Sequence, residues 1–599
     1  MSKTVLPLIV ILLAPLGAHG QAPSPEEGHQ AREARKILDP FHSQKAERSD
    51  RKLHIVYFTP KDKKPAANWH ARTQRIMEHV RDFYAEQMDR NGFGRRTIPL
   101  DYDAQKKLVV HLVIGSRPTA AYSTRSGSPI RDEAVPVLAA KGIKASRETL
   151  LIFCHLTTHL GNTIRHNSPY YAGGTARGGT AWVCDSALLD PLDLPRKAPL
   201  LLDGEYGRIS LGRYNSIFLG GTAHELGHAL GLPHNRENPD ERGRGQSLMG
   251  SGNRTYGEQL RGDGKGSFLP LADALRLASH PFFSGSQKSL HVPVKAAFRE
   301  LKFAAKEKRF VVTGMIESSL PCYAVVAYLD PAGGGDYDAH TCTAIPDKMG
   351  RFTLFCNSLV ANRAAELRIV ACLVNGAIHQ QAAPYRVKKD GTPDLDDIRV
   401  RLDLEPMIAA WKVRDRARFD KFRLQTLKGL PEKDAVVEWA GHLADTFGGN
   451  AIHPAPDRVN ATIATVSLSD CAYSSAKVAW IGPARNHVPG EAFFLTVAGQ
   501  RFARGLYAHA PSRYEWTLGR RWKRLQGKAG LQDGNAGSVV FAVKADGKVI
   551  WRSDLVTKPQ LVPFDLDVNG VQTLELAVED GGNGNTSDWG VWLDPKLLR

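Results

Sequence analysis

The stretch Thr222-Ala-His-Glu-Leu-Gly-His-Ala-Leu-Gly-Leu-Pro-His234 places three histidines at a spacing that constrains the local fold. His224 and His228 are four residues apart, so on a helix both imidazoles lie on one face and can reach one tetrahedral ion. Glu225 can reach the open fourth position, where it would take a proton from a water molecule and pass it to a leaving amine. The pattern predicts a zinc-dependent hydrolase with His224, His228 and His234 as metal ligands and Glu225 as the catalytic residue.

A straight helix would carry the next ligand away from the metal, so the chain must turn before His234. Gly231 can adopt the left-handed conformation that ends a helix, and Pro233 then prevents the helix from resuming. We therefore expect Gly231 to be the turn of the motif. Two alternatives stay open: incidental histidines, or a structural zinc, although structural sites usually close the fourth position with a protein ligand.

The motif H-E-x-x-H-x-x-G-x-x-H resembles that of the metzincin clan of zinc metallopeptidases. The clan also has a methionine turn beneath the metal, and Ser247-Leu-Met-Gly250 places Met249 15 residues after His234. The resemblance implies an endopeptidase with one catalytic Zn²⁺ ion above Met249, whereas a Ca²⁺ ion is not readable from the sequence. Some metzincins bring a tyrosine two residues past the methionine to the zinc. That position is Ser251 here, and we interpret Tyr256, the nearest tyrosine, as a packing residue.

Apolar runs of β-type composition, with one long helical pattern, precede the motif. They predict strands at 53–58, 108–114, 149–154 and 179–184, and a helix over about 69–91. The resemblance implies an α+β metzincin-like catalytic domain with a mixed sheet over residues 51–285, in which an edge strand pairs with an extended peptide. Thr180 to Val183 is a candidate for that edge strand, and an ordinary structural strand is the alternative.

The first 20 residues have the pattern of a cleavable signal peptide, with Lys3, an apolar run over 5–13 and small residues within 18–20 at the expected cleavage site. No later run approaches 18 apolar residues, so we expect a secreted, extracellular or periplasmic protein without a transmembrane segment. Residues 21–50 are polar and charged, which predicts a linker or a short pro-segment. The net charge of +17 favours anionic glycans or cell envelopes as surfaces, and no nucleic-acid partner is expected for an exported chain.

The seven cysteines contain no C-x-x-C pair, so we expect no cysteine-based zinc cluster. In an oxidising compartment they could form up to three disulfides with one cysteine left over. The simplest pairing joins Cys154 with Cys184 and makes two bridges within the middle region, among Cys322, Cys342, Cys356 and Cys372. Buried free thiols, including Cys471, are the alternative.

The pattern changes after the catalytic region. Short β-type runs between turn residues predict a small β-sandwich over residues 290–390, and residues 391–455 have helical patterns typical of a packed connector. The predicted fold class is therefore multidomain, ending in a galactose-binding-like β-sandwich over residues 456–599.

This last unit resembles the NPCBM module, a carbohydrate-binding β-sandwich, in its strand order and in its G-L-x-x-H-A, F-x-V-x-x-D-G and closing D-W-x-x-W signatures. Sugar binding needs aromatic faces for the apolar ring surfaces and carboxylates or amides for the hydroxyl groups. Six residues of these types are candidates for a glycan site: Trp480, His509, Asp580, Asp588, Trp589 and Trp592. Each of them also has an alternative role in the core or in a turn.

We predict from these patterns a secreted zinc metalloendopeptidase that a glycan-binding module directs to glycoproteins or polysaccharide-rich surfaces. The expected partners are a protein or glycoprotein substrate and a carbohydrate ligand. The alternative is a non-catalytic glycan-binding or adhesive surface protein with a zinc-binding domain. The presence of Glu225 favours the enzyme, because a domain that had lost turnover would not need this acid.

Overall fold

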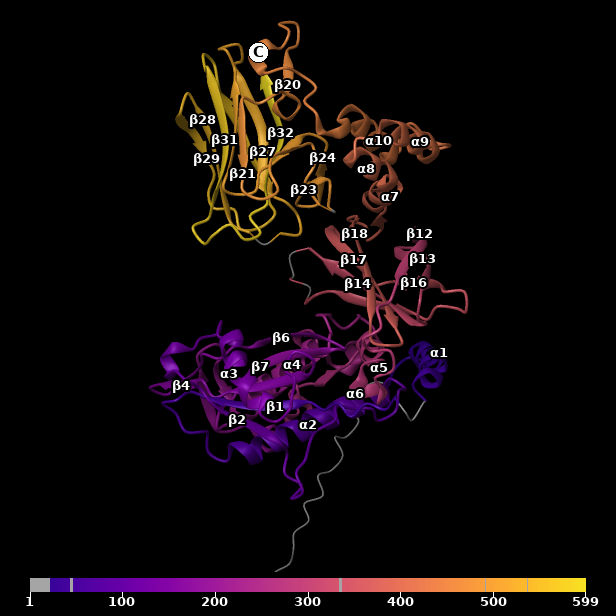
Figure 1. Ribbon diagram of the computed structural model, residues 1–599, viewed down its shortest axis with the longest axis vertical. Helices are drawn as coiled ribbons and strands as arrows, with labels where there is room; N and C mark the ends of the chain where they lie inside the picture. Colours follow the sequence, from indigo (N-terminus) through magenta and orange to yellow (C-terminus); the bar gives the residue numbers. More distant parts are fainter. Residues whose placement is uncertain (1–21, 44–46, 333–334, 336, 491, 536) are drawn as a thin grey trace, which may run out of the picture. The chain divides into compact units, whose positions relative to one another are not determined.

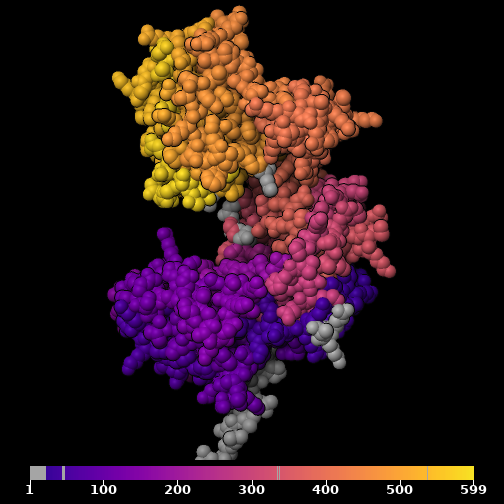
Figure 2. All heavy atoms as spheres, viewed as in Figure 1, coloured from indigo at the N-terminus to yellow at the C-terminus, as the bar shows by residue number. Residues whose placement is uncertain are grey.

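A computed structural model describes residues 22–43, 47–332, 335, 337–490, 492–535 and 537–599 (Figure 1 and Figure 2). The predicted signal peptide lies outside these residues. The chain divides into two compact units, one formed by 1–383 with 387–393 and the other by 384–386 with 394–599. Within the described residues, no helix has both the length and the apolar character needed to cross a membrane.

The first unit contains a five-stranded sheet in the order β2-β1-β3-β7-β6. Four strands run parallel: β2 (Val110–Ile114), β1 (His54–Thr59), β3 (Thr149–Cys154) and β7 (Gly178–Cys184). The fifth, β6 (Tyr171–Thr175), is antiparallel to β7 and forms the edge, so the sheet is mixed as predicted. Thr180 to Val183 lie in β7, which pairs on both sides; these residues are an ordinary structural strand because β6 takes the edge position.

Helices cover both faces of this sheet (Figure 1). One face packs on α2 (Trp69–Arg90) and α4 (Leu211–Ala229), and the other packs on α3 (Gly127–Ala139). The helices α5 (Leu271–Ala278) and α6 (Pro281–Ser284) follow. Two smaller sheets complete this region, one of β4 (Thr157–Leu160), β5 (Thr163–His166), β8 (Leu200–Asp203) and β9 (Gly207–Ser210), and one of β10 (Gln246–Ser247) and β11 (Ser267–Phe268).

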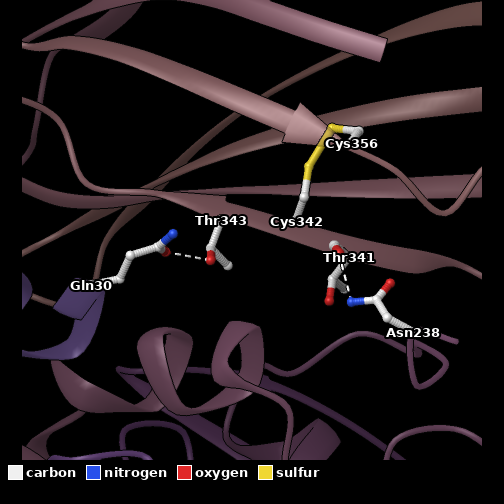
Figure 3. The surroundings of a disulfide bond; sticks show 6 residues. All are labelled: Gln30, Asn238, Thr341, Cys342, Thr343 and Cys356. Atoms are coloured by element: carbon white, nitrogen blue, oxygen red, sulfur yellow. Dashed lines mark hydrogen bonds between the residues drawn. A yellow bond between two sulfur atoms is a disulfide. The ribbon is translucent and has the colours of Figure 1, made fainter. Parts of the chain in front are cut away.

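Residues 25–42, expected as a linker or a pro-segment, form the helix α1 (Pro25–His42). Ser24 and Glu27 close its first turn with a capping box, and Ala31, Ala34 and Leu38 are fully buried in the main core. The helix contacts α5 and β14, and Gln30 accepts a hydrogen bond from the Thr343 hydroxyl group of the β-sandwich (Figure 3). Only three small or apolar residues, spaced by three and four positions, carry this packing, which is a weak local pattern in the sequence. The assignment of residues 21–50 as a linker or a short pro-segment stays a prediction.

A β-sandwich follows in the same unit, as the β-type runs predicted. One sheet contains β12 (Ala296–Lys306), β13 (Arg309–Ser318) and β16 (Arg351–Cys356). The other contains β15 (His340–Ala344), β14 (Cys322–Pro331), β17 (Arg363–Leu373), β18 (Ile378–Val387) and β19 (Pro393–Asp394). Tyr323, Val326 and Tyr328 of β14 belong to the same buried cluster as α4 and α5, so the sandwich shares the core of the mixed-sheet region.

One disulfide is present, between Cys342 on β15 and Cys356 at the end of β16, and it joins the two sheets of the sandwich (Figure 3). The expected bridge between Cys154 and Cys184 does not form, and these two and the other three cysteines are free thiols. Cys154 and Cys184 are register partners on neighbouring strands, but Cys154 packs in the core on one face of the sheet and Cys184 in the core on the other. Register alone therefore does not bring the two sulfur atoms together.

The second unit begins with four helices around their own apolar cluster: α7 (Asp396–Asp403), α8 (Glu405–Lys412), α9 (Arg416–Leu427) and α10 (Ala435–Asp445). A β-sandwich follows. Its first sheet contains β22 (Ala484–Arg485), β25 (Gly505–Tyr507), β32 (Gly590–Leu598), β27 (Arg524–Leu531) and β30 (Val562–Asp567), with β20 (Thr465–Ser467) paired to β32.

The second sheet of this sandwich contains β21 (Ser475–Val478), β26 (Ser512–Thr517), β31 (Thr573–Asp580), β28 (Val539–Ala545) and β29 (Lys548–Arg552). A short hairpin of β23 (Leu495–Val497) and β24 (Gln500–Phe502) stands beside the two sheets. Large buried aromatic residues, Trp516, Trp522 and Trp592 among them, fill the space between the sheets. The unit therefore has a core of its own, which is the architecture that the NPCBM resemblance implies.

Candidate metal centre

The helix α4 positions the first part of the motif. The Ser210 hydroxyl caps its first turn by accepting from the backbone N–H of Arg213, and nearly every residue of the helix is buried. After the last turn, Gly231 has a φ of 94°, a left-handed conformation that favours glycine, and the backbone N–H of Leu232 donates to the Gly227 carbonyl oxygen. The chain thus reverses at Gly231, as the sequence predicts, and returns His234 to the other two histidines.

The three imidazoles converge on one point. The Nε2 atom of His228 lies 3.1 Å from Nε2 of His224 and 3.0 Å from Nε2 of His234, and the ligand atoms of the three residues all lie within 4.8 Å of one another. On the far side of each ring, Nδ1 of His224 lies 2.7 Å from the Leu248 carbonyl oxygen and Nδ1 of His228 lies 2.7 Å from that of Leu232. These carbonyl groups accept from Nδ1–H, which directs the Nε2 lone pairs inward.

Electrostatics favour neutral rings at this place. Burial, reinforced by the neighbouring imidazole of His228, lowers the pKa of His224 to about 3. A neutral imidazole is the form that ligates a metal ion. The donor set therefore fits a small divalent cation that accepts nitrogen ligands in tetrahedral geometry, and zinc is the most common such ion in proteins of this ligand type.

Glu225 lies beside the triad on α4 and is 7 % exposed. Burial raises the pKa of its carboxyl group to about 8. A divalent cation held by the three histidines would stabilise the carboxylate and lower this pKa again. The environment therefore holds the pKa of Glu225 in the range in which a carboxyl group can both accept and donate a proton near neutral pH.

The sequence predicted a methionine floor, and the structure places Met249 beneath α4. Met249 is fully buried, and a Cβ atom on Gly227 would lie 2.6 Å from its sulfur atom, so a larger residue at Gly227 would force the Met249 side chain to move. Tyr256 is 2 % exposed and packs on Phe83 with 5.1 Å between the ring centroids, in agreement with its interpretation as a packing residue.

Sequence reasoning missed a buried network that anchors the third ligand. Asn235 follows His234 directly, and its Nδ2 donates to Asp273 over 2.6 Å while its Oδ1 accepts from the Ser247 hydroxyl. The backbone N–H of Asn235 also donates to the Met249 carbonyl oxygen over 3.3 Å. The network ties the segment of His234 to the methionine turn and to α5. Nothing in the spacing of these residues along the chain indicates that they meet.

Tyr337 is a second residue that the sequence did not indicate. It lies in the loop between β14 and β15, and its ring stacks on His234 with 3.7 Å between centroids, nearly parallel also to His224 at 6.1 Å. Two hydrogen bonds anchor the strand side of this loop: Arg236 N–H donates to the Ala339 carbonyl oxygen, and Asn238 Nδ2 donates to that of Thr341 (Figure 3). The β-sandwich therefore contributes a side chain to the metal centre.

A cavity of about 230 Å³ adjoins the triad on the side of Gly231. The edge strand β6, the turn after α4, α5 and the β-sandwich all contribute to its wall. The lining residues are Ala172, Gly173, Gly174, His228, Gly231, Leu232, Pro233, Arg276, Tyr328, Arg368 and Gln380.

The six candidate glycan residues divide into different environments. His509 and Trp589 lie near each other, with 6.2 Å between ring centroids, and Asp588 is buried beside them, its Oδ1 accepting from the backbone N–H of Ser538. Trp480 is 57 % exposed, whereas Asp580 accepts from Gly582 N–H within a turn.

Trp592 does not reach a surface where it could bind a sugar. It is fully buried and packs on Phe541 and Phe564 in the core of the second unit, so the interpretation of Trp592 as a glycan contact is corrected to a structural role.

Comparisons with known proteins extend this description. Residues 464–598 match the NPCBM/NEW2 domain, so the C-terminal sandwich is an NPCBM domain, as its signatures implied. No curated protein matches the chain. Among the crystal structures to which this chain is similar is wild-type OgpA from Akkermansia muciniphila, at 24 % identity and a TM-score of 0.49 over 57 % of this chain and 95 % of that chain.

Two structures from Clostridium perfringens are also similar. CBM51 from GH95 in complex with methyl-galactose is 24 % identical, with a TM-score of 0.21, over 22 % of this chain and 99 % of that chain. The M60 catalytic domain with two CBM51 domains from ZmpB is 11 % identical, with a TM-score of 0.22, over 69 % of this chain and 43 % of that chain. At these scores the structural likenesses carry no functional argument, and function must be inferred from the site itself.

Proposed function

We propose that this protein is a zinc-dependent endopeptidase that its NPCBM domain directs to glycoproteins or polysaccharide-rich surfaces. The convergence of three imidazole Nε2 atoms, with a buried carboxyl group beside them, carries the proposal. His224, His228 and His234 would hold one zinc ion. Among the described residues, three histidines can serve as protein ligands, which is the number that catalytic zinc sites use while water or substrate takes the fourth position.

When bound, zinc supplies a Lewis acid that polarises the scissile carbonyl group and makes water acidic enough to react near neutral pH. The side chains perform the remaining steps. Glu225 accepts the proton of the attacking water and then donates it to the nitrogen of the leaving amine, since burial keeps its pKa near the working range. The carbonyl groups of Leu248 and Leu232 hold the rings of His224 and His228 in their ligand orientation.

The position of the edge strand β6 favours an extended peptide as the substrate. The outer backbone edge of β6 is available for pairing because β7 occupies only the other side. Its central residues, Ala172, Gly173 and Gly174, carry no large side chain that would obstruct a second strand. A peptide that pairs with β6 would pass the triad, because Gly174 and Gly231 approach closely, and strand addition would bind it through its backbone.

The NPCBM match supports the glycan-directed part of the proposal, and it is also the observation that favours the alternative function, a non-catalytic glycan-binding or adhesive protein. The two hypotheses differ at Glu225. An adhesive protein needs the metal at most for structure, so a change at Glu225 would leave its function intact, whereas a peptidase requires the carboxylate for proton transfer.

The experiment compares the full chain with its Glu225→Gln and His224→Ala variants. Zinc content is measured by elemental analysis, and hydrolysis is measured on casein and on a glycoprotein. We expect Glu225→Gln to keep the metal and lose about 10²- to 10⁴-fold in rate, and His224→Ala to lose both. Anomalous scattering at the zinc edge should locate the ion between the three rings. Hydrolysis by Glu225→Gln at the wild-type rate would reject the mechanism, and wild-type protein that binds glycans but hydrolyses no protein would establish the alternative.

A further inference from the structure

The cavity beside the metal centre contains polar groups that the proposed reaction does not use. Arg276 from α5 and Arg368 from β17 both line its wall, together with the amide of Gln380 and the phenol of Tyr328. All of these residues belong to the first unit, and three of them come from the β-sandwich. The cavity therefore combines two guanidinium groups with neutral hydrogen-bond donors, next to the metal ligand His228.

Existing partners leave part of this donor capacity available. Among the described residues, Arg368 pairs with Asp330 over 3.4 Å and lies 3.8 Å from Glu366, and these carboxylates offset its charge. Arg276 donates through Nη2 to the Gly231 carbonyl oxygen over 2.7 Å and, among the described residues, makes no ion pair. Tyr328 is 1 % exposed, and its hydroxyl group has no hydrogen-bond partner within the described part of the chain. A buried hydroxyl group in this state is a donor that a ligand can satisfy.

The direction of β6 shows which part of a substrate would reach the cavity. Near its start, Tyr170 donates to the Phe218 carbonyl oxygen in the middle of α4, and near its end Thr175 lies against Gly231. The strand β6 thus runs along α4 from its middle to its C-terminal end. A peptide that pairs antiparallel to β6 therefore places the residues N-terminal to its scissile bond at the Gly231 end, where the cavity lies.

We propose that this cavity is a specificity subsite that binds a carboxylate side chain, aspartate or glutamate, on the N-terminal side of the scissile bond. Arg276, which makes no ion pair among the described residues, supplies positive charge, and the Tyr328 hydroxyl group donates to the second carboxylate oxygen. A cavity of about 230 Å³ accommodates such a side chain and a few water molecules. This inference names the substrate preference of the proposed peptidase and rests on that function.

The test begins with the full-length enzyme and a peptide library derived from a proteome. Cleavage-site profiling should show aspartate and glutamate enriched at a single position N-terminal to the cleaved bond. Two peptides that differ only by glutamate or glutamine at that position are then compared. We expect the glutamate peptide to have about a tenfold higher kcat/KM, since a partly desolvated charge pair contributes more than an exposed one.

Three variants assign the preference to the cavity. Arg276→Lys keeps the positive charge but loses the planar guanidinium group and its paired N–H donors, and we expect it to reduce the glutamate preference by a few fold. Tyr328→Phe removes only the hydroxyl group and should reduce the preference about threefold with the fold intact. Arg276→Gln removes the positive charge and should bring the ratio of the two peptides close to one. The matched control is Arg299→Gln, an exposed arginine on the same β-sandwich, which should leave the ratio at its wild-type value.

A binding measurement separates this inference from the proposed function. In the Glu225→Gln background, calorimetry with the two peptides gives the preference without turnover. Cleavage with equal rates for both peptides, or an unchanged preference in both Tyr328→Phe and Arg276→Gln, would overturn the subsite while the peptidase function stands. If no peptide is cleaved by the wild type, yet the glutamate peptide binds about tenfold tighter, then the subsite stands and the peptidase function fails.

Discussion

The substitution of Gly174 by alanine tests whether the edge strand must lie directly against the active-site helix. A Cβ atom at Gly174 would lie 1.9 Å from the carbonyl oxygen of Ala229 and 2.7 Å from the Cα atom of Gly179. Both neighbours are backbone atoms, so no side-chain rotation can relieve the contact. Ala229 directly follows the ligand His228, and any displacement of this turn therefore reaches the metal centre.

The structure gives the size of the displacement. An ordinary van der Waals contact begins at 3.4 Å, so β6 and the end of α4 must separate by about 1.5 Å to accept the methyl group. Overpacking of this kind typically costs about 1–3 kcal/mol of unfolding free energy. A displacement of about 1 Å near reacting groups can also reduce the rate by about 10²-fold. We expect Gly174→Ala to show both losses.

The neighbouring glycine provides a matched control. A Cβ atom at Gly173 would meet nothing within 4 Å, so Gly173→Ala adds the same methyl group to the same strand without a clash. Its effect on stability should stay within about 0.5 kcal/mol. Urea denaturation measures the stability of both variants, chelator competition measures their zinc affinity, and kcat/KM is measured on one peptide. Equal values for the two variants in all three assays would refute the claim that close packing of β6 on α4 positions the site.

Four further changes test other parts of the structure. Replacement of Tyr337 by alanine should weaken zinc binding about three- to tenfold, because a stacked aromatic pair contributes about 0.5–1.5 kcal/mol. The matched change at Phe355, which is 56 % exposed on the same sandwich, should leave zinc affinity unchanged, and equal affinities for the two variants would contradict the role of Tyr337. Burial lowers the pKa of His280 to about 3. Below about pH 6.5 the unfolded chain binds a proton at this residue and the folded chain does not, so the free energy of unfolding falls as the pH decreases. Relative to wild type, His280→Asn should therefore gain about 2 kcal/mol between pH 7 and pH 5 in chemical denaturation, and a pH-independent difference would contradict this assignment. Met249→Leu should retain zinc and most activity at a cost below about 1.5 kcal/mol, whereas loss of the metal would show that the sulfur atom is a ligand. The isolated segment 461–599 should fold cooperatively and retain a carbohydrate on a glycan array, and a folded segment that retains none would remove the glycan-directed part of the proposal.

The sequence by itself determined the local geometry of the metal centre. The spacing of His224 and His228 places both rings on one helix face because helical periodicity is fixed by bonded geometry, and Gly231 marks the reversal because few other residues adopt its φ of 94° without strain. The same kind of local signal predicted the mixed sheet and identified the C-terminal module before the domain match was known. Each of these signals is a short pattern of residues that are close together along the chain.

Tertiary structure decided which distant segments meet. The edge position of β6, the burial of α1, the single disulfide and the stacking of Tyr337 on His234 all join residues that are far apart in the chain or carry weak local patterns. The cavity formed by Arg276 and Arg368 has the same origin. Such contacts follow from how whole layers pack against one another, and the local sequence of a segment does not indicate which layer will pack on it. The motif thus specified the proposed metal ligands, whereas the packing of the β-sandwich on the mixed-sheet region determined what surrounds them.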